Sequence, residues 1–492
     1  MNKKTKKKHD PIEIPSIIIC RVVAIFLILG ALGMGMVNLN FKDGFYDNVS
    51  VSALLQNGIV SILQTHVSSG SVLTGILVFI AVSLLFCLVL KIVSVEKRTF
   101  SRRLKVTIGI VLAALGLRIA AILAWKLPQT SDFLDNYEMA QLLTTIPIGY
   151  WGRFLHEMGT QWTGIWSANM PFLLYEAILL KYGISPGVMN VIYGTLTCLF
   201  TALAAKELFG EKAFETALLF MALNPLNILF TGIFSNQHPA TMLMVAALWI
   251  ALKYKRLPGA LISGAVLSAA QIMRPEMYVV AIGILLIYII AWVRGEKKGA
   301  VRAVAFFAAF AGRILICDGI MRQGGLISGH IYSGNLQYKL CVGLNKETRG
   351  GWSQADMDLL NTPSQLWDTL MTRLFERGNL PLMFQKVVYQ FGSYVYPWIM
   401  DTENHPLFSN LICRRAVSAY MMIIALLAAI KLIRDQKNRS KIFEVGVILF
   451  GYMAVYALIE IQPRYNFTII PLLSMIAADI QMKQESRKKG LK

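Results

Sequence analysis

The short polar segment SDFLDN (131–136) offers the clearest chemistry in this chain. Asp132, Asp135 and Asn136 are spaced i, i+3 and i+4, so they share one face if the segment is helical. A carboxylate held between lipid and water can have its pKa raised towards neutrality, which suits a general base for a hydroxyl group. The same residues also fit helix capping, with Ser131 or Asp132 as the cap and Asp135 in the first turn, so both roles stay open.

Two arginines lie in short polar segments where apolar runs end, Arg274 in MRPEM and Arg464 in IQPRYNF. A guanidinium at such a place can bind a phosphate group by paired hydrogen bonds, and Arg464 has Tyr465 beside it. An ion pair of Arg274 with Glu276 or with an aspartate is the alternative. A third segment, SNQH (235–238), offers amide and imidazole groups, although a tight turn needs polar residues in any case.

Membrane-spanning helices are the elements expected to position these residues. Hydrophobic residues make up 55% of the 492-residue chain and charged residues only 15%, with a mean hydropathy of +0.55. This is more apolar surface than one soluble core needs, which indicates an all-α polytopic membrane protein. The net charge of +20 comes in short basic clusters between apolar runs, which favours contact with anionic lipid and argues against nucleic acid as a partner.

About twelve apolar runs have the length expected of transmembrane helices. They lie at about 16–39, 71–93, 106–127, 184–206, 213–234, 239–253, 258–273, 277–293, 301–319, 413–433, 441–461 and 466–482. With the amino terminus inside, the cytoplasmic connections carry 30 of the 48 Lys and Arg residues. The positive-inside rule therefore predicts that both termini are cytoplasmic. The first run is predicted to be a retained helix rather than a cleaved signal peptide.

The polar segments described above then fall together on the outer side. The stretch 165–182 would break this arrangement as a further span, so we expect an amphipathic helix at the outer interface, with a thirteenth span as the alternative. Outer loops are expected near 40–70 and 320–412, the second large enough to form a small domain. Its segment GLNKETRGGWSQAD (343–356) has glycines and asparagine that allow positive φ and backbone approach to a ligand.

Arg118 and Arg313 lie inside predicted spans and should face protein or water. We expect them to brace helix packing, with a role along a lipid-phosphate groove as the alternative. Six cysteines without a CxxC pair indicate free thiols, and a link from Cys341 to Cys317 or Cys413 is the alternative. Scattered histidines, without HExxH, DxD or P-loop motifs, predict neither a bound metal nor a nucleotide cofactor.

Taken in order, these segments resemble the GT-C superfamily of polytopic glycosyltransferases, in particular the branch of the protein O-mannosyltransferases and the lipid A aminoarabinose transferase. SDFLDNYEMA is similar to the first catalytic outer loop of that branch. NPLNILFTGIFSNQH, MRPEM, YKLCVGLNKETRGGWSQAD and QPRYNFTIIPLL resemble further segments of members from Gram-positive bacteria. The resemblance runs from about residue 105 to 480 and leaves residues 1–105 outside.

The resemblance implies inverting transfer of a sugar from a polyprenyl-phosphate carrier to an extracytoplasmic acceptor: a cell-wall polymer, glycolipid or protein. Asp132 would act as the base, with Asp135 as the second candidate, and Arg274, Arg464 and Tyr465 would contact the donor phosphate. The residues expected to contact acceptor or sugar are Tyr137, Asn236, Gln237, His238, Glu276, Asn345, Trp352 and Asp356. Turn and core roles fit Trp352 and Asp356 equally well. The branch often has a second acidic residue where this chain has 236–238.

The expected organisation has four parts in a bacterial cell membrane. They are a basic tail with two additional spans (1–105), a GT-C-like core with a catalytic outer loop at 128–183 (106–319), an extracytoplasmic loop domain (320–412) and the last spans with a basic tail (413–492). The expected partners are membrane lipid, the lipid-linked donor and the acceptor. Two alternatives remain: a transporter, which should show similar halves and midplane charges, and a glycan polymerase or ligase with a diphosphate donor.

Overall fold

The computed structural model describes residues 12–40, 69–93, 100–125, 127, 129–159, 161–332, 335–394, 411–434 and 439–479. These residues form helices joined by turns, and no strand occurs among them. Three predicted features lie outside the described residues: most of the basic amino-terminal tail, the outer loop near 40–70 and the basic carboxyl-terminal tail.

Six of the described helices are long and apolar enough to cross a membrane. They cover Glu13–Leu39, Ser101–Ala124, Pro186–Phe209, Lys298–Gln323, Cys413–Arg434 and Ser440–Leu458. Three more, Val72–Leu88, Leu257–Met273 and Tyr278–Val293, are apolar but shorter. The described part of the chain is therefore all-α and has the helices of a membrane protein, whereas a total of about twelve spans stays a prediction.

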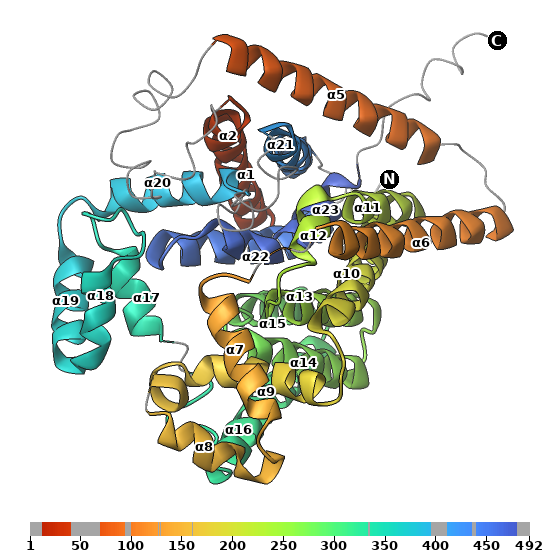
Figure 1. Cartoon of the computed structure of the whole chain (residues 1–492). Helices are drawn as coiled ribbons and strands as arrows, with labels where there is room; N and C mark the ends of the chain where they lie inside the picture. Colours follow the sequence, from red (N-terminus) through yellow and green to blue (C-terminus); the bar gives the residue numbers. More distant parts are fainter. Residues whose placement is uncertain are drawn as a thin grey trace, which may run out of the picture.

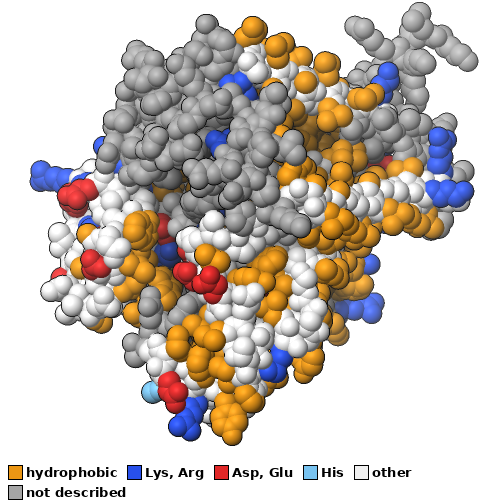
Figure 2. Space-filling model, viewed as in Figure 1, with side chains coloured by type: hydrophobic (Ala, Val, Ile, Leu, Met, Phe, Trp, Pro, Cys, Tyr) orange, Lys and Arg blue, Asp and Glu red, His pale blue; other side chains and the backbone are white. Residues whose placement is uncertain are grey.

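The helices of the expected spans pack side by side in Figure 1, with α5 along the upper edge against α21. Their bounds are α1 (Glu13–Gly30), continued by the π-helical η1 (Ala31–Gly35) and by α2 (Met36–Asn40), then α5 (Ser69–Val93), α6 (Phe100–Ala124), α10 (Pro186–Phe209), α13 (Gln237–Lys253), α14 (Leu257–Met273), α15 (Tyr278–Val293), α16 (Lys298–Gln323), α21 (Leu411–Arg434) and α22 (Arg439–Leu458). Apolar side chains cover much of the right-hand surface near α6 in Figure 2, which suits contact with lipid.

Two expected spans are not continuous helices. The run 213–234 is divided into α11 (Glu211–Ala222) and α12 (Pro225–Phe230). Asn224 caps α12 by accepting a hydrogen bond from the Asn227 backbone N–H at 3.1 Å, and Pro225 lacks the N–H that would continue α11. The run 466–482 begins as the 3₁₀ helix η7 (Pro463–Thr468) and is α-helical only in α23 (Ile470–Ala477) within its described part.

Residues 1–105 were outside the resemblance, yet α1 is central to the packing. It contacts α20 (Asn379–Gly392), α21 and α22. A Cβ on Gly392 would lie 2.2 Å from the Gly30 carbonyl oxygen, so glycine is needed for this close crossing. As a result α20 packs with the spans, although the sequence placed it in an outer loop domain.

Other described residues of that loop segment form a small core, at the left of Figure 1. It consists of α17 (Leu336–Gly343), α18 (Gln354–Asp358) and α19 (Pro363–Phe375). Its buried apolar side chains are Tyr338, Cys341, Val342, Leu344, Leu366 and Leu370. This small core lies within the loop domain expected at 320–412.

Three shorter helices follow α6: α7 (Asp132–Thr144), α8 (Trp151–Glu157) and α9 (Met170–Lys181). The amphipathic surface helix expected at 165–182 is not what the structure shows, because within α9 only Ile178 is exposed. The helix packs against α7 and α14. Lys181 ties its end to α7 by donating hydrogen bonds to the carbonyls of Thr144 (3.0 Å) and Ile146 (2.9 Å).

The two arginines expected to brace helix packing do make such contacts. Arg118 is fully buried and donates hydrogen bonds to the Met221 carbonyl of α11 and to the Cys198 sulfur of α10, each at 3.3 Å. Arg313 donates to the Ala265 carbonyl of α14 at 2.8 Å. Each satisfies carbonyl or sulfur acceptors of a neighbouring helix, as a cation in an apolar setting requires.

Candidate functional site

Asp132 is the first residue of α7 and points away from the helix axis towards the last part of the chain. The preceding Ser131 has φ of 53° and makes no side-chain capping hydrogen bond, so the expected capping by Ser131 is wrong. Its hydroxyl donates to Asp132 Oδ1 instead, at 2.8 Å. Asn136 donates to the Asp132 carbonyl at 2.6 Å, which holds the first turn of α7.

An ion pair joins Asp132 to Arg464, 332 residues further along the chain. The distance from Arg464 Nη2 to Asp132 Oδ2 is 2.6 Å, and the side chains are 11% and 54% exposed, respectively. The guanidinium lies 5.2 Å from the ring centre of Phe133 and 5.9 Å from that of Tyr465. Gln462 accepts a hydrogen bond from Arg464 Nε, and Gln237 donates one to the Arg464 carbonyl. Arg464 is therefore fixed on several sides, while Asp132 is open to solvent.

Arg274 also lies close to the ring of Tyr465. Its guanidinium carbon is 5.6 Å from the ring centre of Tyr465. Asn236 accepts a hydrogen bond from Arg274 Nη1 at 2.9 Å, and Glu276 forms an ion pair with Arg274 Nε at 2.9 Å. The ion pair with Glu276 that was the alternative for MRPEM is thus present, and it stands within the same network as Asp132.

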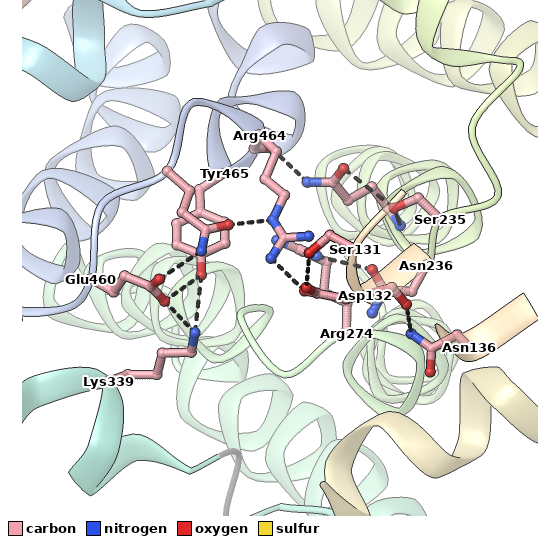
Figure 3. A network of polar contacts seen from close by, with 12 residues as sticks. Ser131, Asp132, Asn136, Ser235, Asn236, Arg274, Lys339, Glu460, Arg464 and Tyr465 are labelled. Atoms are coloured by element: carbon pink, nitrogen blue, oxygen red, sulfur yellow. Dashed lines mark hydrogen bonds and ion pairs between the residues drawn. The ribbon is translucent and has the colours of Figure 1, made fainter. Parts of the chain in front are cut away.

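A third pair, Lys339 with Glu460, completes the network and was not predicted. Lys339 on α17 forms an ion pair with the fully buried Glu460 and lies 3.4 Å from the Tyr465 hydroxyl oxygen. That hydroxyl donates to Glu460 at 3.1 Å, as does the Gln462 amide at 2.6 Å. Figure 3 shows Lys339 and Glu460 on one side of Tyr465, and Arg464 and Asp132 on the other.

The only sequence signal for this third pair was weak. Glu460 was counted within the apolar run 441–461, where a lone carboxylate requires a partner. Lys339 lies 121 residues away, in a segment where a solvent-facing lysine is equally ordinary. Nothing in the sequence joins the two, so neither was a candidate site residue.

The electrostatics of Asp132 differ from the expectation of a raised pKa. The protein around Asp132 removes part of its hydration and so opposes its ionisation, even though the side chain is half exposed. The Arg464 guanidinium and the Ser131 hydroxyl outweigh this and hold the pKa of Asp132 well below its usual range. Burial raises the pKa of Asp135, and the carboxylates of Asp132 and Glu138 raise it further. Burial also favours the neutral form of Glu460, but the Lys339 ammonium outweighs this and lowers the pKa of that carboxyl.

Several predicted site residues belong to this network: Asp132, Asn236, Gln237, Arg274, Glu276, Arg464 and Tyr465. His238 does not. It is buried between the rings of Phe230 and Phe467, with Nε2 3.0 Å from the Phe230 carbonyl oxygen. The His238 ring therefore faces the protein core. His238 and Gln237 are successive residues of α13, so their side chains point in different directions around the helix axis.

Two further candidates on α7 point elsewhere. The Tyr137 ring packs 5.0 Å from that of Phe234. Asp135 is exposed and lines a shallow surface depression with Glu138, Met139 and Leu142. Asp132 and Asp135 therefore have different partners, since Asp132 pairs with Arg464 while Asp135 lines the depression.

Two of the candidates in the 343–356 segment, Asn345 and Asp356, contact each other. Asp356 is buried and accepts a hydrogen bond from Asn345 at 2.8 Å and an ion pair from Arg373 at 2.7 Å. Trp352 is exposed. The glycine expected to let backbone approach a ligand instead approaches the chain itself, because a Cβ on Gly343 would lie 2.0 Å from the Leu458 carbonyl oxygen.

This close approach connects the loop segment to the residues before Arg464. The Ile461 N–H donates to the Gly350 carbonyl at 3.0 Å, and the Glu460 N–H donates to the Lys339 carbonyl at 2.9 Å. Lys386 of α20 donates to the Gly343 carbonyl at 2.6 Å, and burial lowers the pKa of this lysine to about 7. The loop segment is therefore hydrogen-bonded to the residues that lead into Arg464.

Within the described residues, no group of three or more His, Cys, Asp or Glu side chains is arranged to hold a metal ion. All six cysteines are free thiols. The site itself brings together three carboxylates, a phenol, amides and three cations.

Comparison with known proteins finds similarity to solved structures. No protein-family profile and no curated protein matches the chain. Among solved structures, the crystal structure of the Archaeoglobus fulgidus oligosaccharyltransferase in complex with zinc and sulfate is similar to it, with a TM-score of 0.32 and 14% sequence identity. The similarity covers 76% of this chain and 53% of that one, so the chain spans about half the length of this match.

Proposed function

We propose that the protein is an integral membrane glycosyltransferase that transfers a sugar from a polyprenyl-phosphate carrier to an acceptor hydroxyl outside the cytoplasm. One observation carries the proposal: Asp132 forms an ion pair with Arg464, and Arg274 and Lys339 belong to the same network around Tyr465. A base beside a set of cations is what such a transfer needs, because a proton leaves the acceptor while a phosphate leaves the sugar.

The proposed reaction is a single displacement at the anomeric carbon. The acceptor oxygen forms a bond to this carbon on the face opposite the phosphate, and the bond from the carbon to the phosphate oxygen breaks, which inverts the configuration. Asp132 takes the proton of the acceptor hydroxyl. The lipid phosphate leaves with the bonding electrons, and Arg274, Arg464 and Lys339 stabilise its charge.

The location follows from the charge pattern of the sequence. In this proposal the protein lies in a bacterial cell membrane with both termini in the cytoplasm, and the network faces the outer leaflet. The exposed apolar side chains of the six candidate spans support contact with lipid. The acceptor is a cell-wall polymer, a glycolipid or a protein.

A direct test uses the full-length protein in detergent or proteoliposomes. It is incubated with a panel of undecaprenyl-phosphate sugars and candidate acceptors, and the loss of sugar from each lipid is measured by mass spectrometry. We expect one donor to lose its sugar with the wild-type protein. Release from none of them, with binding to none, contradicts the proposal and favours transport of a different substrate.

A further inference from the structure

The network around Tyr465 contains three cations, and each has a carboxylate partner. Arg464 pairs with Asp132, Arg274 with Glu276 and Lys339 with Glu460. The formal charge of these six groups therefore sums to zero. A phosphate that enters such a balanced network meets as much negative as positive charge, so it binds well only if one carboxylate gives up its cation.

The three carboxylates differ in how readily each can move away from its cation. Glu460 is fully buried and accepts hydrogen bonds from Tyr465 and Gln462 in addition to its ion pair. Releasing it would leave an uncompensated charge inside the protein. The Glu276 side chain is 19% exposed and two residues from Arg274. Asp132 is 54% exposed and can turn into solvent at small cost.

Arg464, by contrast, is held by other contacts and would stay in position if the Asp132 carboxylate moved away. Its side chain is packed over the Phe133 and Tyr465 rings, and Gln462 accepts the hydrogen bond from its Nε. The Nη2 atom that now contacts Asp132 would then face the entering ligand. A planar guanidinium held in this manner suits a phosphate oxygen as well as a carboxylate oxygen.

We infer that Asp132 and the phosphate of the lipid-linked substrate compete for Arg464, so that binding of the phosphate releases the carboxylate. This exchange rests on the proposed function and adds a control to it: the base is held by Arg464 until the donor arrives. The low pKa of Asp132 in the ligand-free protein agrees with this picture, because a carboxylate on a guanidinium is a weak proton acceptor. Loss of the guanidinium and approach of a second anion both strengthen it as a base.

The exchange makes an uncommon prediction: removing the charge of the proposed base should tighten binding of the substrate's phosphate. Farnesyl monophosphate is a suitable probe, and its binding to full-length protein in detergent is measured by isothermal titration calorimetry. We expect Asp132→Asn to bind it roughly threefold to tenfold more tightly than the wild type. Glu138→Gln removes the same charge from an exposed site on α7 and should change the affinity less than about twofold.

Two additional ligands and a double variant identify the source of the effect. Inorganic phosphate should show the same order of affinities with weaker binding, and farnesol should show no difference between the proteins, because only the anion competes. In an Arg464→Gln background, Asp132→Asn should no longer tighten binding. Circular dichroism and gel filtration verify that each variant is folded.

The outcomes separate the two proposals. Unchanged or weaker binding of farnesyl monophosphate to Asp132→Asn overturns the exchange, because Asp132 would then orient Arg464 rather than compete for it. That result leaves sugar transfer standing. Absence of binding to the wild type and to every variant overturns both, since the cations would then not form a phosphate site.

Discussion

Two arginine–carboxylate pairs in this protein have nearly the same geometry but different surroundings. Arg464 and Asp132 are 2.6 Å apart, and Arg373 and Asp356 are 2.7 Å apart. The Asp132 side chain is 54% exposed, whereas that of Asp356 is 1% exposed and is further held by Asn345. The chemistry of the pair therefore does not decide its role. Burial makes the Asp356 pair structural, and exposure leaves the Asp132 pair open to exchange.

The strongest test of this comparison is Asp132→Asn. We expect sugar transfer to fall by about 10² to 10⁴, because loss of a general base has an effect of this size. Thermal unfolding should change little, since the Asp132 side chain is 54% exposed. Full transfer activity in Asp132→Asn would place the base elsewhere.

Whereas Asp132→Asn should mainly affect sugar transfer, Asp356→Ala should mainly affect stability. It leaves Arg373 and Asn345 without their partner in the small core of α17–α19, so we expect a loss of about 3 kcal/mol in the free energy of unfolding. Thermal and denaturant unfolding measure this loss. Asp358→Ala, at an exposed position of the same helix, is the matched control and should be neutral. A neutral Asp356→Ala would remove the contrast between the two pairs.

Asp135→Asn sharpens the comparison within α7. Asp135 lies beside Glu138 and Leu142 on an exposed part of the helix. We expect transfer activity to fall by less than about tenfold, the effect of one nearby charge rather than of a base. A loss as large as that in Asp132→Asn would assign the base to Asp135.

The smallest expected effect is in the pH dependence of stability. The folded-state pKa of Asp132 is depressed, so its stabilising contribution is present above the unfolded-state pKa of about 4 and is lost as the pH falls through the folded value. The difference in melting temperature between wild type and Asp132→Asn should be constant above about pH 5 and shrink below about pH 4. A difference that first appears on raising the pH above neutrality contradicts the ion pair.

Much of the fold and part of the site could be predicted from the sequence. Apolar runs and basic clusters identify most helices, because helix periodicity and lipid contact are local properties. The division at Asn224–Pro225 was not predicted, because the apolar run 213–234 continues across it, although a capping residue followed by proline favours the start of a helix. Segments that contain Asp132, Arg274 and Arg464 were predicted to lie on one side, because each stands next to an apolar run, and the structure brings these three side chains close together.

What the sequence by itself determined is therefore which residues lie at helix ends and which carry charge. Only the tertiary structure decided the partners: Lys339 with Glu460, 121 residues apart, and Arg464 with Asp132, 332 apart. The tertiary structure also places the His238 side chain in the core and buries Asp356 beside α17 and α19. The physical reason is that local patterns set helices, while burial and pairing depend on packing between distant segments.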